Sequence, residues 1–272
     1  MSDILLERVQ LPQGRRLRGG LLDSAETLPE GWERGIRFRT IGCVPPEVLG
    51  VCEVGDPEDV RPSSAEFRPA WLRTNAVCAL MSQVGTVNLS LNRLEAVTEW
   101  GLARMLATGG GTDVGVNPPN TSFLDATVVH ASAGATAADV VNTVSCIEQA
   151  VADTGYGAAA VLHAPFRAAA WLRSNHLIDP VTNLSPSGLQ WIVSPGYPID
   201  DDGVTTTIWA TGPVWASVDE SYVLAQRDAQ GRTVDFRTNL DAAYSQRLGL
   251  AAFDPCLNLA ASFVAPACNG DS

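Results

Sequence analysis

Two stretches near the N-terminus lack the periodic apolar pattern from which a helix or strand builds a core. Residues 1–35 contain scattered glycine and proline and a near balance of arginine and acidic side chains. Residues 44–64 are rich in proline, glycine and acid. Such segments bury too little apolar surface to offset the entropy lost on ordering. We therefore expect residues 1–35 to form an extended arm, either disordered or ordered by a neighbouring molecule.

The second stretch lies between two short strand patterns. Residues 36–44 and 65–74 alternate apolar and polar positions, as half-buried strands do. A long polar connection between two strands predicts a projecting hairpin over residues 36–75. Connections of this length are uncommon in compact domains and tend to be functional.

The rest of the chain has mixed helix and strand patterns. One stripe at helical spacing predicts a long helix over residues 85–107, ending at Gly109–Gly111, and Gly101 in that stripe would allow another backbone to approach. The stripe contains Val87, Leu91, Leu94, Thr98 and Met105. A second helix is expected from Thr136, capped by Asp139, to Gly155.

Shorter elements alternate after residue 155. Strands are expected at 158–165, 189–198 and 205–218, with a short helix at 166–175. The last stretch has the pattern of a strand, a linker, a short helix and a final strand. This order indicates an α+β protein.

The charge of the chain excludes several classes of function. The net charge is −12, and all 18 basic residues are arginine. Without lysine there is no phosphate-loop lysine, no Schiff base and no lysine cross-link. An acidic chain is a poor candidate for nucleic-acid recognition or for docking on an anionic membrane. No apolar run is long enough to span a bilayer.

Few side chains suggest catalysis or metal binding. His163, at the end of a buried-type strand, is either a catalytic base or a hydrogen-bonded core histidine, and we favour the core role. Asp200, Asp201 and Asp202 are either a cation site or a solvated turn, and we favour the turn. Glu95 and Glu99 are expected on a helix rim that faces solvent or another subunit. We expect no catalytic residue, no cofactor and no metal.

The cysteines and tryptophans suggest packing or contact between subunits. The six cysteines form no C-x-x-C pair, so we favour small buried hydrophobic roles, although Cys43 and Cys52 could pair in an oxidising setting. No secretory signal pattern is evident, which favours a reducing cytosol. Trp32 and Trp71 lie outside periodic segments and are interface candidates, because tryptophan is frequent in interface hot spots. Core packing is expected for the tryptophans Trp171, Trp191 and Trp209.

Four parts of the chain together resemble the major capsid proteins of tailed bacteriophages, whose fold encapsulin shells share. AEFRPAWLRTNAVCALMSQVGTVNLSLNRLEAVTEWGLARMLATGG resembles the run into and along the family's spine helix. AAAVLHAPFRAAAWLRSN resembles the strand and helix of its axial domain, and IVSPGYP with TIWATGPVWASVDE resembles later axial strands. SQRLGLAAFDPCLNLAASFVAP resembles the closing strands of the peripheral domain.

The resemblance implies a division of the chain into five parts. They are an N-terminal arm (1–35), an extended hairpin loop (36–75), a peripheral domain with the spine helix (76–130), an α/β axial domain (131–222) and return strands of the peripheral domain (223–272). The arm and the loop would contact neighbouring subunits, so removing residues 1–30 should leave a folded subunit that assembles poorly.

The function implied is a structural subunit, not an enzyme, of an icosahedral capsid made of hexamers and pentamers. The capsid would be assembled in the host cytoplasm and become part of the virion. It would enclose double-stranded DNA without sequence-specific binding, and a weakly repulsive acidic inner wall would let the genome slide in. Decoration, scaffold and portal proteins are further partners that the family suggests.

Two alternatives remain open at this point. An encapsulin-type compartment would have the same fold around a cargo enzyme. A soluble α/β enzyme would use His163 with a nearby acid such as Glu148.

Overall fold

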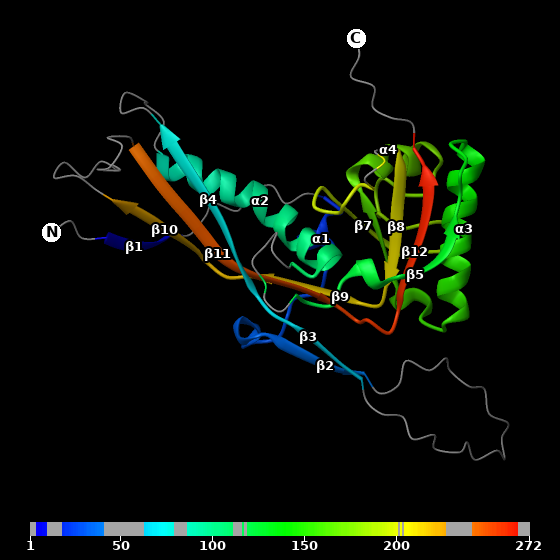
Figure 1. Ribbon diagram of the computed structural model, residues 1–272, viewed down its shortest axis with the longest axis horizontal. Coiled ribbons are helices and arrows are strands. Elements are labelled where there is room, and N and C mark those ends of the chain that lie inside the picture. The colour runs from blue at the N-terminus through cyan, green and yellow to red at the C-terminus, as the bar shows by residue number, and fades with distance from the viewer. Residues whose placement is uncertain are drawn as a thin grey trace, which may run out of the picture.

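The described residues of the chain form two five-stranded sheets and one two-stranded ribbon, with helices packed on the sheets (Figure 1). This computed structural model describes residues 4–9, 18–40, 63–78, 86–110, 116, 119–200, 202, 204–226 and 241–265. The described elements agree with the expected α+β class. Among them, no helix has the length and apolar character needed to cross a membrane.

The first sheet is antiparallel and carries the longest helix. Its strands run in the order β1-β10-β11-β4, and β9 pairs with the far end of β11. Their bounds are β1 (Ile4–Val9), β4 (Ala70–Cys78), β9 (Val214–Val218), β10 (Ser221–Gln226) and β11 (Asp241–Phe253). Helix α2 (Thr86–Thr108) packs along β11 and β4 and covers one face of the sheet (Figure 1).

The apolar stripe of α2 is the part that meets this sheet. Leu94 and Met105 are fully buried, and the expected helix is confirmed to within one residue at each end. It ends where Gly109 and Gly110 take positive φ angles of 72° and 78°, which glycine adopts without strain. The expected close approach at Gly101 comes from a side chain, because a Cβ there would lie 2.6 Å from Cδ2 of Leu72.

The second sheet has the order β5-β12-β8-β6-β7 and is mixed. The strands are β5 (Thr127–Ala131), β6 (Val161–Pro165), β7 (Gln190–Ser194), β8 (Thr205–Thr211) and β12 (Asn258–Val264). Helix α3 (Ala137–Asp153) packs on β12 and β5, and α4 (Phe166–Ser174) packs on β6 and β7. The expected capping box is confirmed, since the Thr136 hydroxyl accepts from the Asp139 amide and the Asp139 carboxylate accepts from the Thr136 amide.

Two strands lie in a different sheet from the one that the expected division implies. Strand β12, expected among the peripheral return strands of 223–272, pairs with β8 in the second sheet. Strand β9, expected in the axial range 131–222, pairs with β11 in the first sheet. The chain passes between the sheets at Gly212–Pro213 and again at 254–257, so each sheet takes strands from both halves of the sequence.

The short helix expected in the last stretch is wrong. Residues 241–253 form the long strand β11, which pairs with β10 and β9 on one side and β4 on the other. Along it Ala243, Ser245 and Arg247 are buried, whereas Tyr244 is 48% exposed. This alternation matches a strand with one covered face, and pairing on both edges overrides local helix propensity.

The expected hairpin begins as an antiparallel ribbon. Strand β2 (Ile36–Thr40) pairs with β3 (Ser63–Phe67), and β3 leads through Arg68 and Pro69 into β4. The Phe67 side chain is buried and its ring lies 5.6 Å from that of Phe253, so the base of the ribbon is anchored in the core of the first sheet. The connection at 41–62, which contains most of the expected loop, lies outside the described residues.

The N-terminal arm is not independent of its own subunit, which corrects our expectation for residues 1–35. Strand β1 pairs with β10 in the first sheet. Residues 18–35, here called the junction segment, form the short helix α1 (Leu21–Ser24) and the 3-10 turn η1 (Trp32–Arg34). Leu21 is fully buried and Leu28 and Trp32 are nearly so. Trp32 is therefore a core residue of this subunit and not an interface residue.

This packing reverses the expected effect of truncation. Deleting residues 1–30 removes β1, Leu21 and Leu28, and loss of one buried leucine side chain alone costs about 2–5 kcal/mol. We expect the truncated chain to be mostly insoluble or to unfold at much lower urea concentration, measured by circular dichroism. A truncated chain as stable as the full chain would contradict the packing of this segment.

A single charged substitution should destabilise the protein on the buried face of α2 but not on its exposed face. Replacing the fully buried Leu94 with Asp places a carboxylate in the core, and we expect a loss of soluble folded protein. The matched control is Ala96→Asp on the exposed face of the same helix, which should change stability by less than about 1 kcal/mol. Thermal unfolding of both variants measures the difference.

Candidate functional site

His163 is a residue of β6 in the second sheet and has no exposed surface. Its Nδ1 lies 2.8 Å from the Tyr197 hydroxyl and its Nε2 lies 2.9 Å from the Thr211 hydroxyl. The Phe123 ring packs against the imidazole with centroids 4.6 Å apart. The favoured role of His163 as a hydrogen-bonded core residue agrees with this environment.

The hydrogen bonds fix which nitrogen carries the proton. The Thr211 hydroxyl donates its single proton to the carbonyl of Gly212, so it can only accept from His163. Nε2–H therefore donates to Thr211, and Nδ1 accepts from Tyr197. Burial lowers the pKa of His163 to about 3, so the ring is neutral at physiological pH.

The enzyme hypothesis needs an acid beside His163, and the structure places the named acid elsewhere. Glu148 lies on α3 and accepts a hydrogen bond of 2.6 Å from the exposed Ser187 hydroxyl. Both ring nitrogens of His163 are already bonded within the core. Such a ring cannot take a proton from a substrate without losing a bond, so nothing in this arrangement favours a catalytic role.

Glu99 on α2 has a structural role that the sequence analysis missed. Its carboxylate accepts hydrogen bonds from the amides of Leu21 and Leu22, the latter at 3.2 Å, at the start of α1. Burial raises the pKa of the Glu99 carboxyl, although these amides and the Ser194 hydroxyl favour its charged form. Glu99 is thus not on a free rim, which corrects that expectation, and it joins the junction segment to α2.

The junction segment also bonds to both sheets through its backbone. The amide of Val193 in β7 donates to the carbonyl of Gly19, at 2.9 Å. Further along, Glu26 forms a parallel bridge with Trp215 of β9, and the Leu28 amide donates to the Ser217 hydroxyl at 3.0 Å. These bonds fix the two sheets and α2 relative to one another.

An aromatic cluster fills the space between the two sheets. Phe123, in the 3-10 turn η3 (Phe123–Asp125), is almost fully buried. Its ring lies 5.8 Å from that of Trp209 in β8 and 5.2 Å from that of Phe253 in β11. The sequence gives no periodic signal here, because Phe123 belongs to an irregular segment whose partners are remote in the chain.

The acidic turn before β8 forms local hydrogen bonds. The Asp202 carboxylate accepts from the Thr205 hydroxyl and from the amides of Val204 and Thr205, and these bonds, the hydroxyl's first, lower the pKa of that carboxyl. The Asp200 carboxylate accepts from the Thr207 hydroxyl at 2.9 Å, and Asp201 lies outside the described residues. Within the described part of the chain, no group of three or more His, Cys, Asp or Glu side chains could hold a metal ion.

The face of the first sheet opposite α2 carries exposed aromatic side chains. Leu72 points to α2, so its neighbour Trp71 points to the other face, where it is 42% exposed. Its ring contacts that of Tyr222 at 6.1 Å, and Tyr244 on the same face is 48% exposed. Trp71 therefore remains an interface candidate.

The described cysteines do not behave alike. Cys146 on α3 is free and half-buried. Cys256 is disulfide-bonded, so the expectation of small buried hydrophobic roles is wrong for this residue. Cys43 and Cys52 lie outside the described residues.

The neutral, buried His163 makes stability depend on pH. Between pH 6.5 and its folded pKa of about 3, the unfolded chain binds a proton that the folded chain does not, so stability falls as pH decreases. We expect the unfolding free energy to fall by about 2 kcal/mol between about pH 7 and pH 5. His163→Gln, which has no titrating ring, should lack this part of the slope in urea unfolding. Parallel slopes for the two proteins would contradict the assignment.

The fold is shared with solved structures, although no family model and no curated protein matches the chain. A chain from Mycobacterium phage Ogopogo matches with a TM-score of 0.58 at 12% identity, over 96% of this chain and 97% of that one. A chain from Mycobacterium phage Che8 matches with a TM-score of 0.56 at 12% identity, over 97% and 93%. The capsid of an empty GTA particle matches with a TM-score of 0.54 at 10% identity, over 95% and 93%.

These matches extend over nearly the whole of each chain. At such low identity, the likeness is one of architecture. The chain has the fold of the tailed-phage major capsid proteins.

Proposed function

We propose that this chain is the structural subunit that self-assembles into the icosahedral head shell around a phage genome. The observation that carries the proposal is the near full-length architectural match with the GTA particle capsid and the two mycobacteriophage chains. In this proposal the first sheet and α2 form the peripheral domain, and the second sheet with α3 and α4 forms the axial domain.

Surfaces left open in a single copy support a role in assembly. The β2–β3 ribbon extends away from both sheets beyond its anchored base (Figure 1). It carries an exposed ion pair between Arg37 and Glu66, with Arg68 3.6 Å from the same carboxylate. Exposed Trp71 and Tyr244 occupy a sheet face that no helix of the described chain covers. Aromatic and arginine side chains are frequent in the centres of protein interfaces.

The absence of lysine determines how such a shell is held together. Some members of the resembled family cross-link lysine to asparagine, and this chain has no lysine. The contacts between subunits are therefore burial, hydrogen bonds and arginine–carboxylate pairs, which are bidentate in their best geometry. We expect assembled particles to dissociate fully to single chains in denaturing electrophoresis.

The proposed shell also implies the oligomers that the chain forms, the place where it assembles and its other partners. The chain is not an enzyme, forms hexamers and pentamers, and is assembled in the host cytoplasm into a virion capsid. Its acidic balance supports enclosure of double-stranded DNA without sequence-specific binding, since a basic face is the usual footprint of a DNA binder. Scaffold, portal and decoration proteins are its further expected partners.

Electron microscopy of the purified chain tests the function. We expect closed icosahedral shells to form as protein concentration rises, with a matching increase in light scattering. The assembly control replaces residues 41–62 with an Asn-Gly turn, which suits a two-residue connection between paired strands. This variant should fold, because Phe67 and both sheets are retained, but should form few closed shells.

Two results would count against the function. A wild-type chain that stays monomeric or dimeric at every concentration would exclude self-assembly. Normal shells from the variant with the shortened ribbon would remove the ribbon from the assembly mechanism.

A further inference from the structure

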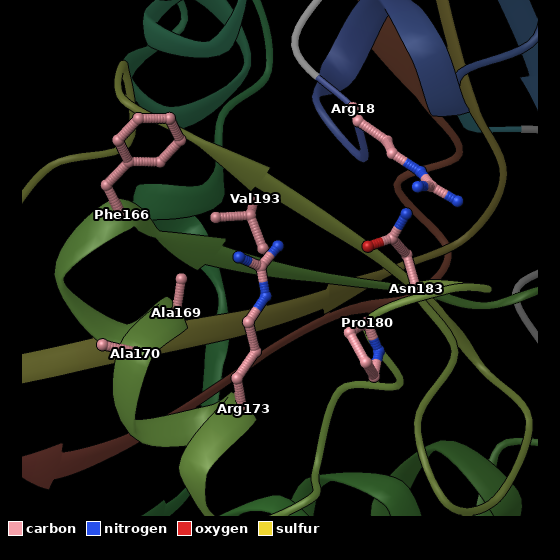
Figure 2. A pocket seen from close by; sticks show the side chains of 8 residues that line it. All are labelled: Arg18, Phe166, Ala169, Ala170, Arg173, Pro180, Asn183 and Val193. Carbon is pink, nitrogen blue, oxygen red and sulfur yellow. The ribbon is translucent and has the colours of Figure 1, made fainter.

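A pocket of about 550 Å³ lies where the junction segment meets the second sheet (Figure 2). Phe166 and Arg173 of α4 form one wall, and Pro180 and Asn183 of the loop before β7 form another. Arg18 of the junction segment closes the opposite side. Figure 2 shows the Arg173 side chain rising into the middle of the pocket beside Val193, with Arg18 entering from the N-terminal segment.

The walls of the pocket are held in place by hydrogen bonds. The Arg18 Nη2 donates to the carbonyl of Val181 at 3.0 Å. The Asp179 carboxylate accepts from the amides of Val181 and Thr182, which fixes the loop. Gly19 has a positive φ of 72°, and a Cβ there would lie 2.9 Å from the Asn183 side chain. The pocket is thus preformed, and binding would cost little ordering of its walls.

Two cationic groups remain available to a ligand. A guanidinium has five N–H donors, and Arg18 uses one of its two terminal nitrogens on Val181. Within the described part of the chain, the Arg173 guanidinium has no hydrogen-bond or ion-pair partner. Two guanidinium groups that line one pocket repel each other, so a carboxylate between them would be favourable.

The rest of the lining is apolar, which narrows the class of ligand. Phe166 is 47% exposed, and Pro180 and Val193 add aliphatic surface next to the two arginines. A small inorganic anion would leave these groups in contact with water. A peptide segment that alternates carboxylates with aliphatic side chains would satisfy the arginines and bury the apolar wall.

One part of the chain outside the described residues has this chemistry. Residues 41–62 contain five acidic side chains and one arginine, interspersed with valines and Leu49. The segments 10–17 and 227–240 each contain more arginine than acid, 79–85 is uncharged, and 1–3, 111–115 and 266–272 contain a single acidic side chain each. Within 41–62, the run Glu58-Asp59-Val60 places two carboxylates beside an aliphatic side chain.

The occupant comes from another copy of the chain. The end of the β2–β3 ribbon that carries 41–62 lies at the bottom of Figure 1, and α4 lies at the top. We propose that residues 41–62 of a neighbouring subunit dock in the pocket between Arg18 and Arg173. The inference rests on the proposed shell function, since only assembly would bring the ribbon of one copy to the pocket of the next.

Charge reversal tests the contact. Arg173→Glu should leave urea unfolding unchanged and reduce the yield of closed shells by about tenfold or more, because like charges then face each other across the contact. Arg34→Glu, at an exposed residue of η1, is the matched control with the same change in net charge and should assemble normally. Adding Glu58→Arg and Asp59→Arg to Arg173→Glu should restore shells. Equal shell yields for Arg173→Glu and Arg34→Glu would overturn the docking while the shell function stands.

A peptide measurement separates the pocket from assembly. A labelled peptide of residues 44–60, with Cys52→Ser, is added to the variant whose ribbon is shortened, and fluorescence anisotropy reports binding. We expect saturable binding that Arg173→Glu abolishes and that Arg34→Glu preserves, and this result keeps the docking even if the wild-type chain fails to form shells. Binding of a scrambled peptide, or displacement by double-stranded DNA at matched charge, would show a general anion site and overturn the proposal.

Discussion

The hydrogen bonds of Glu99 join three parts of the molecule that lie far apart in the sequence. The Glu99 carboxylate, on α2, accepts hydrogen bonds from the first amides of α1. The first of these, the amide of Leu21, lies 78 positions from Glu99 in the chain. The same side chain is hydrogen-bonded to Ser194 at the end of β7. Removing a carboxylate from water is costly, and these donors offset the cost only when both sheets and the junction segment are in place. Glu99 therefore couples the order of the N-terminal segment to the relative position of the two sheets.

An element could be predicted from the sequence where the interactions that form it lie within its own segment of the chain. Helices α2 and α3 were predictable because the apolar stripe, the capping box at Thr136 and the glycine stop all lie within the segment they describe. Strand β11 was not, because its alternating burial appears only once β4, β10 and α2 surround it. The same holds for β9 and β12, because each lies in a different sheet from the strand that precedes it in the sequence, β8 and β11 respectively. The aromatic cluster around Phe123 was invisible for this reason as well.

For the candidate functional residues, the sequence identifies the residue, whereas its role depends on tertiary contacts. His163 could be identified from the sequence, but its tautomer depends on Thr211, 48 positions away, donating to Gly212. Glu99 was identified on the correct helix and given the wrong environment, since helical spacing cannot show what packs beside a rim position. Trp32 and Trp71 look alike in the sequence, yet Trp32 is nearly buried and Trp71 is 42% exposed. Only the tertiary contacts separate an interior tryptophan from one that is free to meet a neighbour.

Because the junction segment packs within its own subunit, the contacts between subunits of the proposed shell must be made by other surfaces. An N-terminal segment that completes the core of its own subunit cannot also leave it to hold another without cost, since Leu21 would lose its burial. In its described residues, the subunit has a packed core without any neighbour, and the surfaces left for contacts in the proposed shell are the ribbon, the aromatic sheet face and the arginine pocket. In the proposed shell, where lysine cross-links are impossible, these surfaces would supply reversible contacts, which allow misplaced subunits to dissociate before the shell closes. In that shell, the arginines, which are all of the basic residues of the chain, would be the groups that allow an acidic subunit with a net charge of −12 to pack closely against copies of itself.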